Sequence, residues 1–205
     1  IYGEKLFNNN PFIEKIYETL LNIVVKTSNW NQLLIITDKA YSKKIISKKS
    51  YQENKSIAFF EIAKIKQLGE ISESISYIKK ALLLRKNFAP YVKLYLELLI
   101  QNKNYLVAKK LIRKTWTNNP HPEYKSVIAH LAKCLKMDIL DLAKFISSSS
   151  IKNEESKLLM VEASISSKKW NDARMQIKEF LDIQPKKAIC LLMAAQLSLA
   201  HCKLK

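Results

Sequence analysis

The feature that most constrains the fold of this chain is one pattern of residues written twice between Gly69 and Pro120. Each position of the pattern recurs about 34 residues later, as seen in four pairs: Ile71 with Tyr105, Ser74 with Ala108, Ile78 with Ile112, and Ala81 with Thr115. A repeat of this length is a hairpin of two helices. One hairpin cannot bury its apolar face alone, so it stacks on neighbouring copies.

The residue types within the pattern are those of a tetratricopeptide repeat. The small residues Ser74 and Ala108 stand where two helices of a pair must approach closely, and the larger Ile71 and Tyr105 cover the turn between them. Two glycines and five prolines in 205 residues favour long helices and disfavour sheets. We therefore predict an all-α fold, a right-handed α-solenoid of tetratricopeptide-like helix hairpins.

The same periodicity predicts how the rest of the chain is organised. We expect an irregular leader at residues 1–10 and one helical-repeat domain over residues 11–205. The expected hairpins and the final unpaired helix have these approximate bounds: 11–50, 56–87, 89–118, 123–150, 155–184 and 186–203.

Three segments interrupt the helical pattern. Asn29-Trp30-Asn31 is predicted to be the turn of the first hairpin, and Ser147–Ser150 a loop. The basic segment Lys43–Lys55 either lengthens the preceding helix or forms a solvated loop. The fourth hairpin is shortened, because Trp170 follows Tyr105 by about 65 residues, a little under two repeats.

The chain is strongly basic, with 35 lysines and arginines, 18 acidic residues and a net charge of +17. Only Arg85, Arg113 and Arg174 are arginines. Specific recognition of phosphates and bases favours the arginine fork, so the composition disfavours sequence-specific nucleic-acid binding. The simplest interpretation is a compositional bias toward lysine, isoleucine and asparagine. The alternatives are attraction to an anionic membrane surface, an acidic protein or RNA.

Hydrophobic runs and cysteines bear on the compartment. No apolar run approaches the roughly 20 residues that span a bilayer. Cys134, Cys190 and Cys202 lack CxxC spacing, which indicates buried thiols in a reducing compartment. Because the sequence begins at Ile1 instead of methionine, we expect it to be part of a longer protein.

No arrangement of residues predicts catalysis, a metal site or a cofactor. His130 and Cys134 are four residues apart, but no second pair completes a ligand set. His121 is interpreted as a turn residue that packs on, or hydrogen-bonds to, the next helix. Asp138 and Asp141 are interpreted as helix-start or solvated acids. The three tryptophans occupy core positions of the repeats: Trp30, Trp116 and Trp170.

The remaining candidate site is the concave face that the first helices of the hairpins line. A mixed surface of this kind suits a peptide or protein segment, and it lacks the regular Lys/Asn/Arg set that clamps a C-terminal carboxylate in chaperone-binding repeats. The candidate partner-binding residues are Phe59, Lys66, Lys93, Glu97, Gln101, Leu158 and Glu162, with Ala63 and Ser166 at equivalent positions.

Three short motifs in order carry a resemblance to a known family. Lys110–Trp116 followed by Asn119–Glu123 is similar to an "LL…AW…PHP" stretch, Trp170–Arg174 to a "W…AR" stretch, and Ala188–Ala194 to a "CLLMA" segment. Across about residues 56–200 the chain thereby resembles the bacterial HemY family of tetratricopeptide proteins associated with haem biosynthesis. The motif positions are Trp116, Pro120, His121, Pro122, Trp170, Cys190 and Met193.

The resemblance implies a location and a function. Members of the family are held in the bacterial inner membrane by N-terminal helices that are absent from this chain. Their repeat domain faces the cytoplasm and acts at a late step of protohaem synthesis without catalytic residues of its own. We therefore expect a non-enzymatic scaffold that binds other proteins, haem-biosynthesis enzymes among them. The alternatives are a basic helical-repeat module that binds RNA or another acidic partner, and an enzyme that acts on porphyrins.

Overall fold

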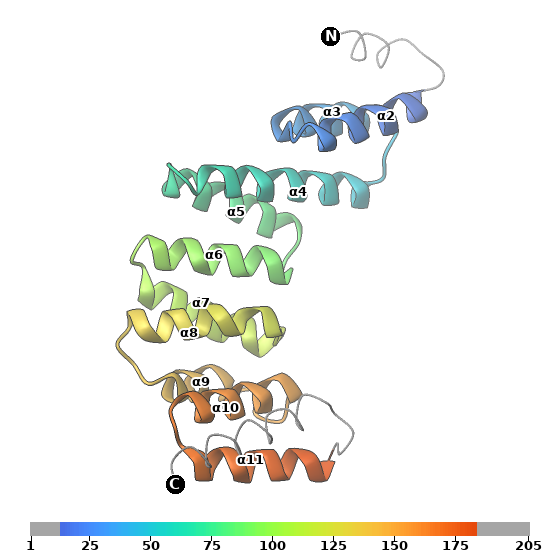
Figure 1. Ribbon diagram of the computed structural model, residues 1–205. Coiled ribbons are helices and arrows are strands. Elements are labelled where there is room, and N and C mark those ends of the chain that lie inside the picture. The colour runs from blue at the N-terminus through green and yellow to red at the C-terminus, as the bar shows by residue number, and fades with distance from the viewer. Residues whose placement is uncertain (1–12, 184–205) are drawn as a thin grey trace. The chain divides into compact units, whose positions relative to one another are not determined.

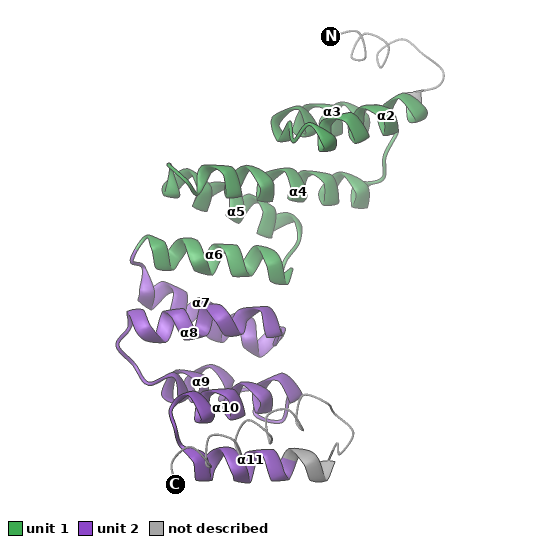
Figure 2. Ribbon diagram, viewed as in Figure 1, with its two compact units in different colours: residues 1–102 green, residues 103–205 purple. Residues whose placement is uncertain are grey.

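The computed structural model describes residues 13–183 and the side chains of residues 14–179. Within residues 13–183 the chain forms ten α-helices, one short 3-10 helix and no strand (Figure 1). The expected leader at residues 1–10 and the expected terminal helix at residues 186–203 lie outside this range. The helices belong to two compact units, residues 1–102 and residues 103–205 (Figure 2).

The first unit is a stack of helices in which each helix packs on the next along the chain. Two hydrophobic clusters form its interior, one centred on Leu33 and Ile36 and the other on Ile78 and Leu98. Its helices are α2 (Ile13–Lys26), α3 (Trp30–Ser42), α4 (Lys48–Lys66), α5 (Ile71–Leu84) and α6 (Ala89–Gln101).

The second unit repeats this organisation and contains the two shortest α-helices of the described residues. Here α7 packs on both helices of the following hairpin, which then contacts α10, and α10 pairs with α11. The helices are α7 (Tyr105–Asn118), η1 (Pro122–Tyr124), α8 (Lys125–Cys134), α9 (Ile139–Ser147), α10 (Glu154–Ser166) and α11 (Trp170–Ile183). The predicted shortened hairpin corresponds to α8 and α9.

The residues of the repeated pattern lie where the pattern predicts. Ser74 and Ala108 are fully buried, and Ile78 and Ile112 are buried one turn further along α5 and α7. The Ser74 hydroxyl donates a 2.6 Å hydrogen bond to the carbonyl oxygen of Ala63, which joins α5 to α4. The predicted fold class, an all-α stack of tetratricopeptide-like hairpins, is confirmed.

The basic segment Lys43–Lys55 differs from the prediction, because most of it is the start of α4. The Ser47 hydroxyl accepts a 3.1 Å hydrogen bond from the backbone N–H of Ser50 and so caps the helix at Lys48. One turn further, the ring of Tyr51 stacks on Tyr41 with a centroid distance of 4.3 Å. This cap and this contact extend the second hairpin N-terminally from its predicted start at residue 56.

The predicted turn at Asn29-Trp30-Asn31 is also wrong in position. Asn29 is the N-cap of α3, and its side-chain oxygen accepts a 3.2 Å hydrogen bond from the backbone N–H of Gln32. Trp30 is consequently the first residue of the helix, and it packs on the cluster around Leu33. The chain reverses just before Asn29, at Ser28, whose φ is 53°.

The boundary between the two units falls between α6 and α7, inside the hairpin predicted at residues 89–118. A single repeat domain over residues 11–205 stays a prediction.

Within residues 13–183, six residues other than glycine have positive φ, and each lies in the turn that follows a helix. The N–H of the residue after Lys136 donates to the carbonyl of Ala132 at 3.0 Å, and the N–H after Lys168 donates to that of Ser164 at 2.9 Å. These are the hydrogen bonds of a helix C-terminus closed by one left-handed residue, a place that glycine usually fills. The φ values lie between 51° and 58°: Ser28, Lys44, Asn87, Lys103, Lys136 and Lys168.

We expect Lys136→Gly and Lys168→Gly each to raise the free energy of unfolding by about 1 kcal/mol, because a Cβ crowds the backbone in the left-handed region. Urea denaturation of the full chain measures the change. Lys136→Ala and Lys168→Ala are the matched controls, since they shorten the side chain but keep Cβ. If the alanine variants gain as much stability as the glycine variants, backbone strain is not the cause.

Candidate functional site

The predicted concave face in the first unit includes residues of α4 and α6. Lys93 and Glu97 are half-buried on α6, and Gln101 is exposed at its end. The Gln67 side-chain amide donates a 3.3 Å hydrogen bond to the Gln101 side-chain oxygen. This bond brings together the C-terminal ends of α4 and α6, as expected for neighbouring first helices of successive hairpins.

Lys66, a further predicted member of this face, is directed toward α5. Its ammonium nitrogen lies 2.9 Å from a Glu73 carboxylate oxygen and 3.3 Å from one of Glu70. The hydrogen bonds that Lys66 donates to Glu73 and then to Glu70 raise the pKa of Lys66, and the bond that Glu73 accepts from Lys66 is the main cause of the lowered pKa of Glu73. Lys66 therefore has partners within its own hairpin.

Phe59 lies in a cluster of aromatic and ammonium groups on α4 and α5. Its ring centroid is 6.2 Å from that of Tyr77. The Lys80 ammonium is 4.8 Å from the Tyr77 centroid and 5.8 Å from the Phe59 centroid, and the Lys55 ammonium is 5.9 Å from Phe59. Cation–aromatic attraction holds these side chains together. We call Tyr51, Lys55, Phe59, Tyr77 and Lys80 the cation–aromatic cluster.

Two predicted members of the face, Leu158 and Glu162, belong to the second unit. The prediction for Leu158 is wrong. Leu158 is 3% exposed and forms a core cluster with Val161, Ala173 and Ile177, so it cannot contact a partner. The reason is that α10 packs on α9 and on α11, and these two helices bury Leu158, which has the same repeat position as Lys93. Glu162 is half-buried, and its carboxylate lies 2.8 Å from the Lys125 ammonium.

The family-motif residues that the structure describes have structural roles. Trp116 is fully buried, and its indole N–H donates a 2.8 Å hydrogen bond to the Ser156 hydroxyl. His121 is the N-cap of η1: its Nδ1 accepts a 3.3 Å hydrogen bond from the Glu123 N–H, and its ring contacts Tyr124. The interpretation of His121 as a turn residue is confirmed. Pro120 is half-buried, and Pro122 begins η1. Trp170 packs on the Leu158 cluster. Cys190 and Met193 lie outside the described residues.

The other polar candidates also have local roles. Asp138 is the N-cap of α9, and its carboxylate accepts hydrogen bonds from the Ser167 hydroxyl and, at 2.8 Å, from the Leu140 N–H. The Ser167 bond, followed by the Leu140 bond, lowers the pKa of Asp138. His130 is exposed. Among the described residues, no three histidine, cysteine, aspartate or glutamate side chains gather into a possible metal site. Over the same part of the chain, every helix is too short or too polar to cross a bilayer.

Tyr124 is a buried residue whose hydroxyl has no hydrogen-bond partner among the described residues. Burial, followed by the negative charge of Glu123, raises its pKa to about 12. A tyrosine pKa raised above its unfolded value of 10.0 stabilises the fold at lower pH, and that stabilisation is lost as the pH rises through 10.0 toward about 12.

We expect Tyr124→Phe to raise the free energy of unfolding by about 1 kcal/mol at neutral pH, because an unpaired buried hydroxyl is removed. As the pH rises above 10, the free energy of unfolding of the variant should also fall less than that of the unsubstituted chain. Urea denaturation at several alkaline pH values measures both effects. Tyr105→Phe, at a half-buried tyrosine, is the control, and equal effects of the two substitutions would contradict the role assigned to Tyr124.

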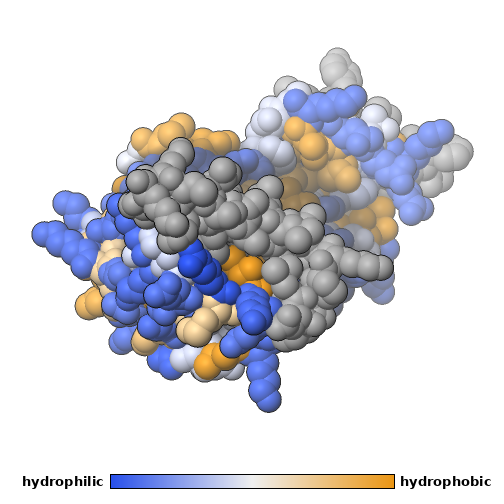
Figure 3. Space-filling view, turned by 60° about the horizontal axis from the view of Figure 1, so that its bottom comes forward, coloured by the Kyte–Doolittle hydropathy of each residue, from blue (hydrophilic) through white to orange (hydrophobic). Residues whose placement is uncertain are grey.

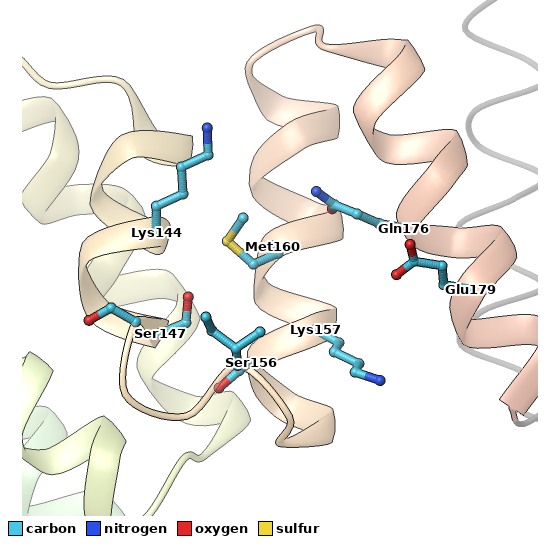
Figure 4. Close-up of a pocket in the computed structure, with 9 residues that line it drawn as sticks. Lys144, Ser147, Ser156, Lys157, Met160, Gln176 and Glu179 are labelled. Atoms are coloured by element: carbon cyan, nitrogen blue, oxygen red, sulfur yellow. The ribbon is translucent and has the colours of Figure 1, made fainter.

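The structure adds a site that the sequence did not predict. A cavity of about 310 Å³ lies between the end of α9, the loop after it, α10 and α11 (Figure 4). Its lining includes the basic residues Lys144 and Lys157, the acidic Glu179, and Ile151, Met160 and Gln176. The only signal in the sequence was the serine-rich loop. The lining residues come from three helices whose periodicities give no hint that one side of each meets at the same place.

Comparisons with known proteins leave the family open. No family model matches the sequence, and no curated protein matches it. One similar solved structure is YrrB, described as a TPR protein with an unusual peptide-binding site, at 13% identity and a TM-score of 0.42 over 95% of this chain and 98% of that chain. Another is PilF of Pseudomonas aeruginosa, at 16% identity and a TM-score of 0.42 over 92% of this chain and 84% of that one.

A third similar structure is a chain of the APC/C hetero-tetramer Cut9-Hcn1, at 12% identity and a TM-score of 0.29. The alignment covers 95% of this chain and 51% of that chain. Likenesses with identities and TM-scores of this size do not assign a function or a family.

Proposed function

We propose that this chain is a non-catalytic scaffold that binds segments of other proteins. The observation that carries the proposal is the first-helix surface of α6. Lys93 and Glu97 are half-buried there, and neither is in an ion pair with any described side chain. Half-buried charges of both signs beside the Gln67–Gln101 bond can pair with the polar groups of a bound segment.

The exchange Lys93→Glu with Glu97→Lys tests this surface without changing the net charge. We expect the exchange to reduce recovery of bound proteins when the full chain is used in a pull-down. The matched control is Glu61→Lys with Lys64→Glu, which reverses an exposed ion pair on α4 whose N···O distance is 2.8 Å. Equal recovery with both double variants would contradict the proposed surface.

The finer part of the proposal is a HemY-type role, in which the scaffold supports a late step of protohaem synthesis on the cytoplasmic side of a bacterial inner membrane. The order of the motifs around Trp116, His121 and Trp170 supports it. In this role the scaffold raises the effective concentration of the enzymes that it gathers. A pull-down from membranes with the intact protein tests it. Recovery of a tetrapyrrole-synthesis enzyme is expected, and recovery of none above background would count against this role.

A second candidate function is RNA binding, which the cation–aromatic cluster favours. Its lysines and aromatic rings are the groups that contact single-stranded nucleic acid, and hydrophilic side chains cover most of the visible described surface (Figure 3). Binding would then weaken steeply with salt, because each phosphate contact releases a counterion. A flat response of the affinity for a poly-uridine probe between low and physiological salt would exclude this function.

A further inference from the structure

The cavity of the second unit has an apolar interior. Met160 projects from α10 into the space beside α9, where Lys144 and Ser147 lie (Figure 4). Ile151, on the loop that follows α9, is 66% exposed although it is a large aliphatic residue. The cavity of about 310 Å³ has room for one or two side chains of a bound segment.

Basic groups lie at the α9 end of this cavity. Arg113 donates a 3.2 Å hydrogen bond from Nη2 to the hydroxyl of Ser148, which lines the cavity. The Arg113 guanidinium carbon is 4.5 Å from the ring centroid of Phe145, so stacking holds the charge in place. Lys144, on α9, also lines this end of the cavity, whereas the Lys157 side chain points away from α9 (Figure 4). Neither lysine is in an ion pair with a described carboxylate.

Hydrogen bonds keep the wall of the cavity in one arrangement. The Ser156 hydroxyl, which lines the cavity, contacts the Ser150 hydroxyl at 3.0 Å and accepts the indole N–H of Trp116 at 2.8 Å. The Ser147 hydroxyl donates to the carbonyl of Ala143 at 2.7 Å. A site whose wall is already ordered loses less entropy when it binds.

Charge decides which occupant fits. Two basic side chains, Arg113 and Lys144, lie at the α9 end of the cavity, whereas the acidic Glu179 of its lining lies on α11 (Figure 4). The α9 end is therefore complementary to a carboxylate next to an aliphatic side chain. Residues 184–205 of this chain carry four lysines and no acidic residue, and a second copy carries a net charge of +17. Both carry an excess of positive charge, so an acidic partner suits Arg113 and Lys144 better than either of them.

We propose that the cavity between α9, α10 and α11 binds a segment of another protein in which an acidic residue stands next to an aliphatic one. The carboxylate pairs with Arg113 and Lys144, and the aliphatic side chain lies on Met160 and Ile151. The Gln176 side-chain oxygen accepts a 3.3 Å hydrogen bond from the Ser164 hydroxyl, and its N–H group, on the α11 side, donates to a backbone carbonyl of the segment. This site is separate from the α6 surface and does not depend on it.

Fluorescence polarisation of labelled octapeptides with the full chain tests the proposal. The probe has two aspartates alternating with two leucines between glycine and serine residues. One comparison peptide has lysine in place of aspartate, and another has serine in place of leucine. We expect the aspartate–leucine probe to bind at least ~10-fold more tightly than either, since loss of the charge pairing or of the apolar contact costs about one decade in affinity.

Variants locate the binding. The double variant Arg113→Glu with Lys144→Glu should weaken binding of the aspartate–leucine probe at least ~10-fold. The control Lys110→Glu with Lys133→Glu makes an equal change of net charge at exposed positions and should change the affinity less than ~2-fold. Ile151→Asp, on the exposed loop, should also weaken binding. The Lys93 and Glu97 exchange should leave it unchanged, which separates this site from the α6 surface.

Several results would overturn the proposal. One is that the probe does not bind at concentrations up to ~1 mM. Another is that all three peptides bind equally, and a third is that the two double charge reversals have equal effects. A photo-crosslinking amino acid at position 151 adds a direct test. Adducts with the probe support the proposal, whereas adducts with residues 184–205 or with a second copy of the chain, in the presence of the probe, would assign the cavity to those occupants instead.

Discussion

Replacing Trp116 by alanine is expected to lower the free energy of unfolding of the second unit by about 3–5 kcal/mol. Trp116 is fully buried, its ring centroid lies 6.3 Å from that of Tyr124, and its indole N–H bonds Ser156. The substitution removes the largest of the fully buried side chains among the described residues and leaves a cavity. Ser156 keeps the contact with Ser150, so the loss is mainly one of packing.

Native-state hydrogen exchange of the full chain measures this change, because amides of α7 and α10 report on the second unit. Trp116→Phe is the first control and should cost less, since a ring remains. Trp170→Ala is the second, because Trp170 is only half-buried against its cluster. If Trp116→Ala costs less than Trp170→Ala, the position of Trp116 in the core is wrong.

Replacing Ser74 by leucine is expected to lower the free energy of unfolding of the first unit by about 2–4 kcal/mol. Ser74 is fully buried, and its hydroxyl on α5 donates a 2.6 Å hydrogen bond to the Ala63 carbonyl of α4. A larger side chain must push the two helices apart, which costs about 1–3 kcal/mol, and the lost hydrogen bond adds about 1 kcal/mol.

Ser74→Ala separates the two contributions. The Ala63 carbonyl still accepts the N–H of Gln67 at 3.0 Å, so it is not left unpaired, and the alanine variant should lose only about 1 kcal/mol. Urea denaturation of both variants, followed by exchange of α4 and α5 amides, gives the values. A leucine variant as stable as the alanine variant would show that the two helices are not in close contact.

The repeated pattern predicted most of the fold because it records helix packing directly. Small residues recur at Ser74 and Ala108 since only they fit where paired helices meet, and both are buried in the structure. His121 was also interpreted correctly, because a histidine between two prolines cannot continue a helix and can cap the next one.

The errors arose where single hydrogen bonds or tertiary contacts decide the structure. The start of α4 depends on the Ser47 cap within a lysine-rich run, where no apolar periodicity marks a helix. Helix ends at Lys136 and Lys168 carry no glycine, so the usual signal for a left-handed residue is missing. Leu158 was placed on the open face by its repeat position, but packing of α10 with its two neighbours buries it.

The central claim is that this chain binds other proteins through its helix surfaces. The most direct measurement introduces a photo-crosslinking amino acid at Lys93 in the intact protein, irradiates the cells and identifies the adducts by mass spectrometry. We predict discrete adducts with one or a few proteins, diminished by Glu97→Lys. Adducts that nuclease removes, or no protein adduct at all, would contradict the claim.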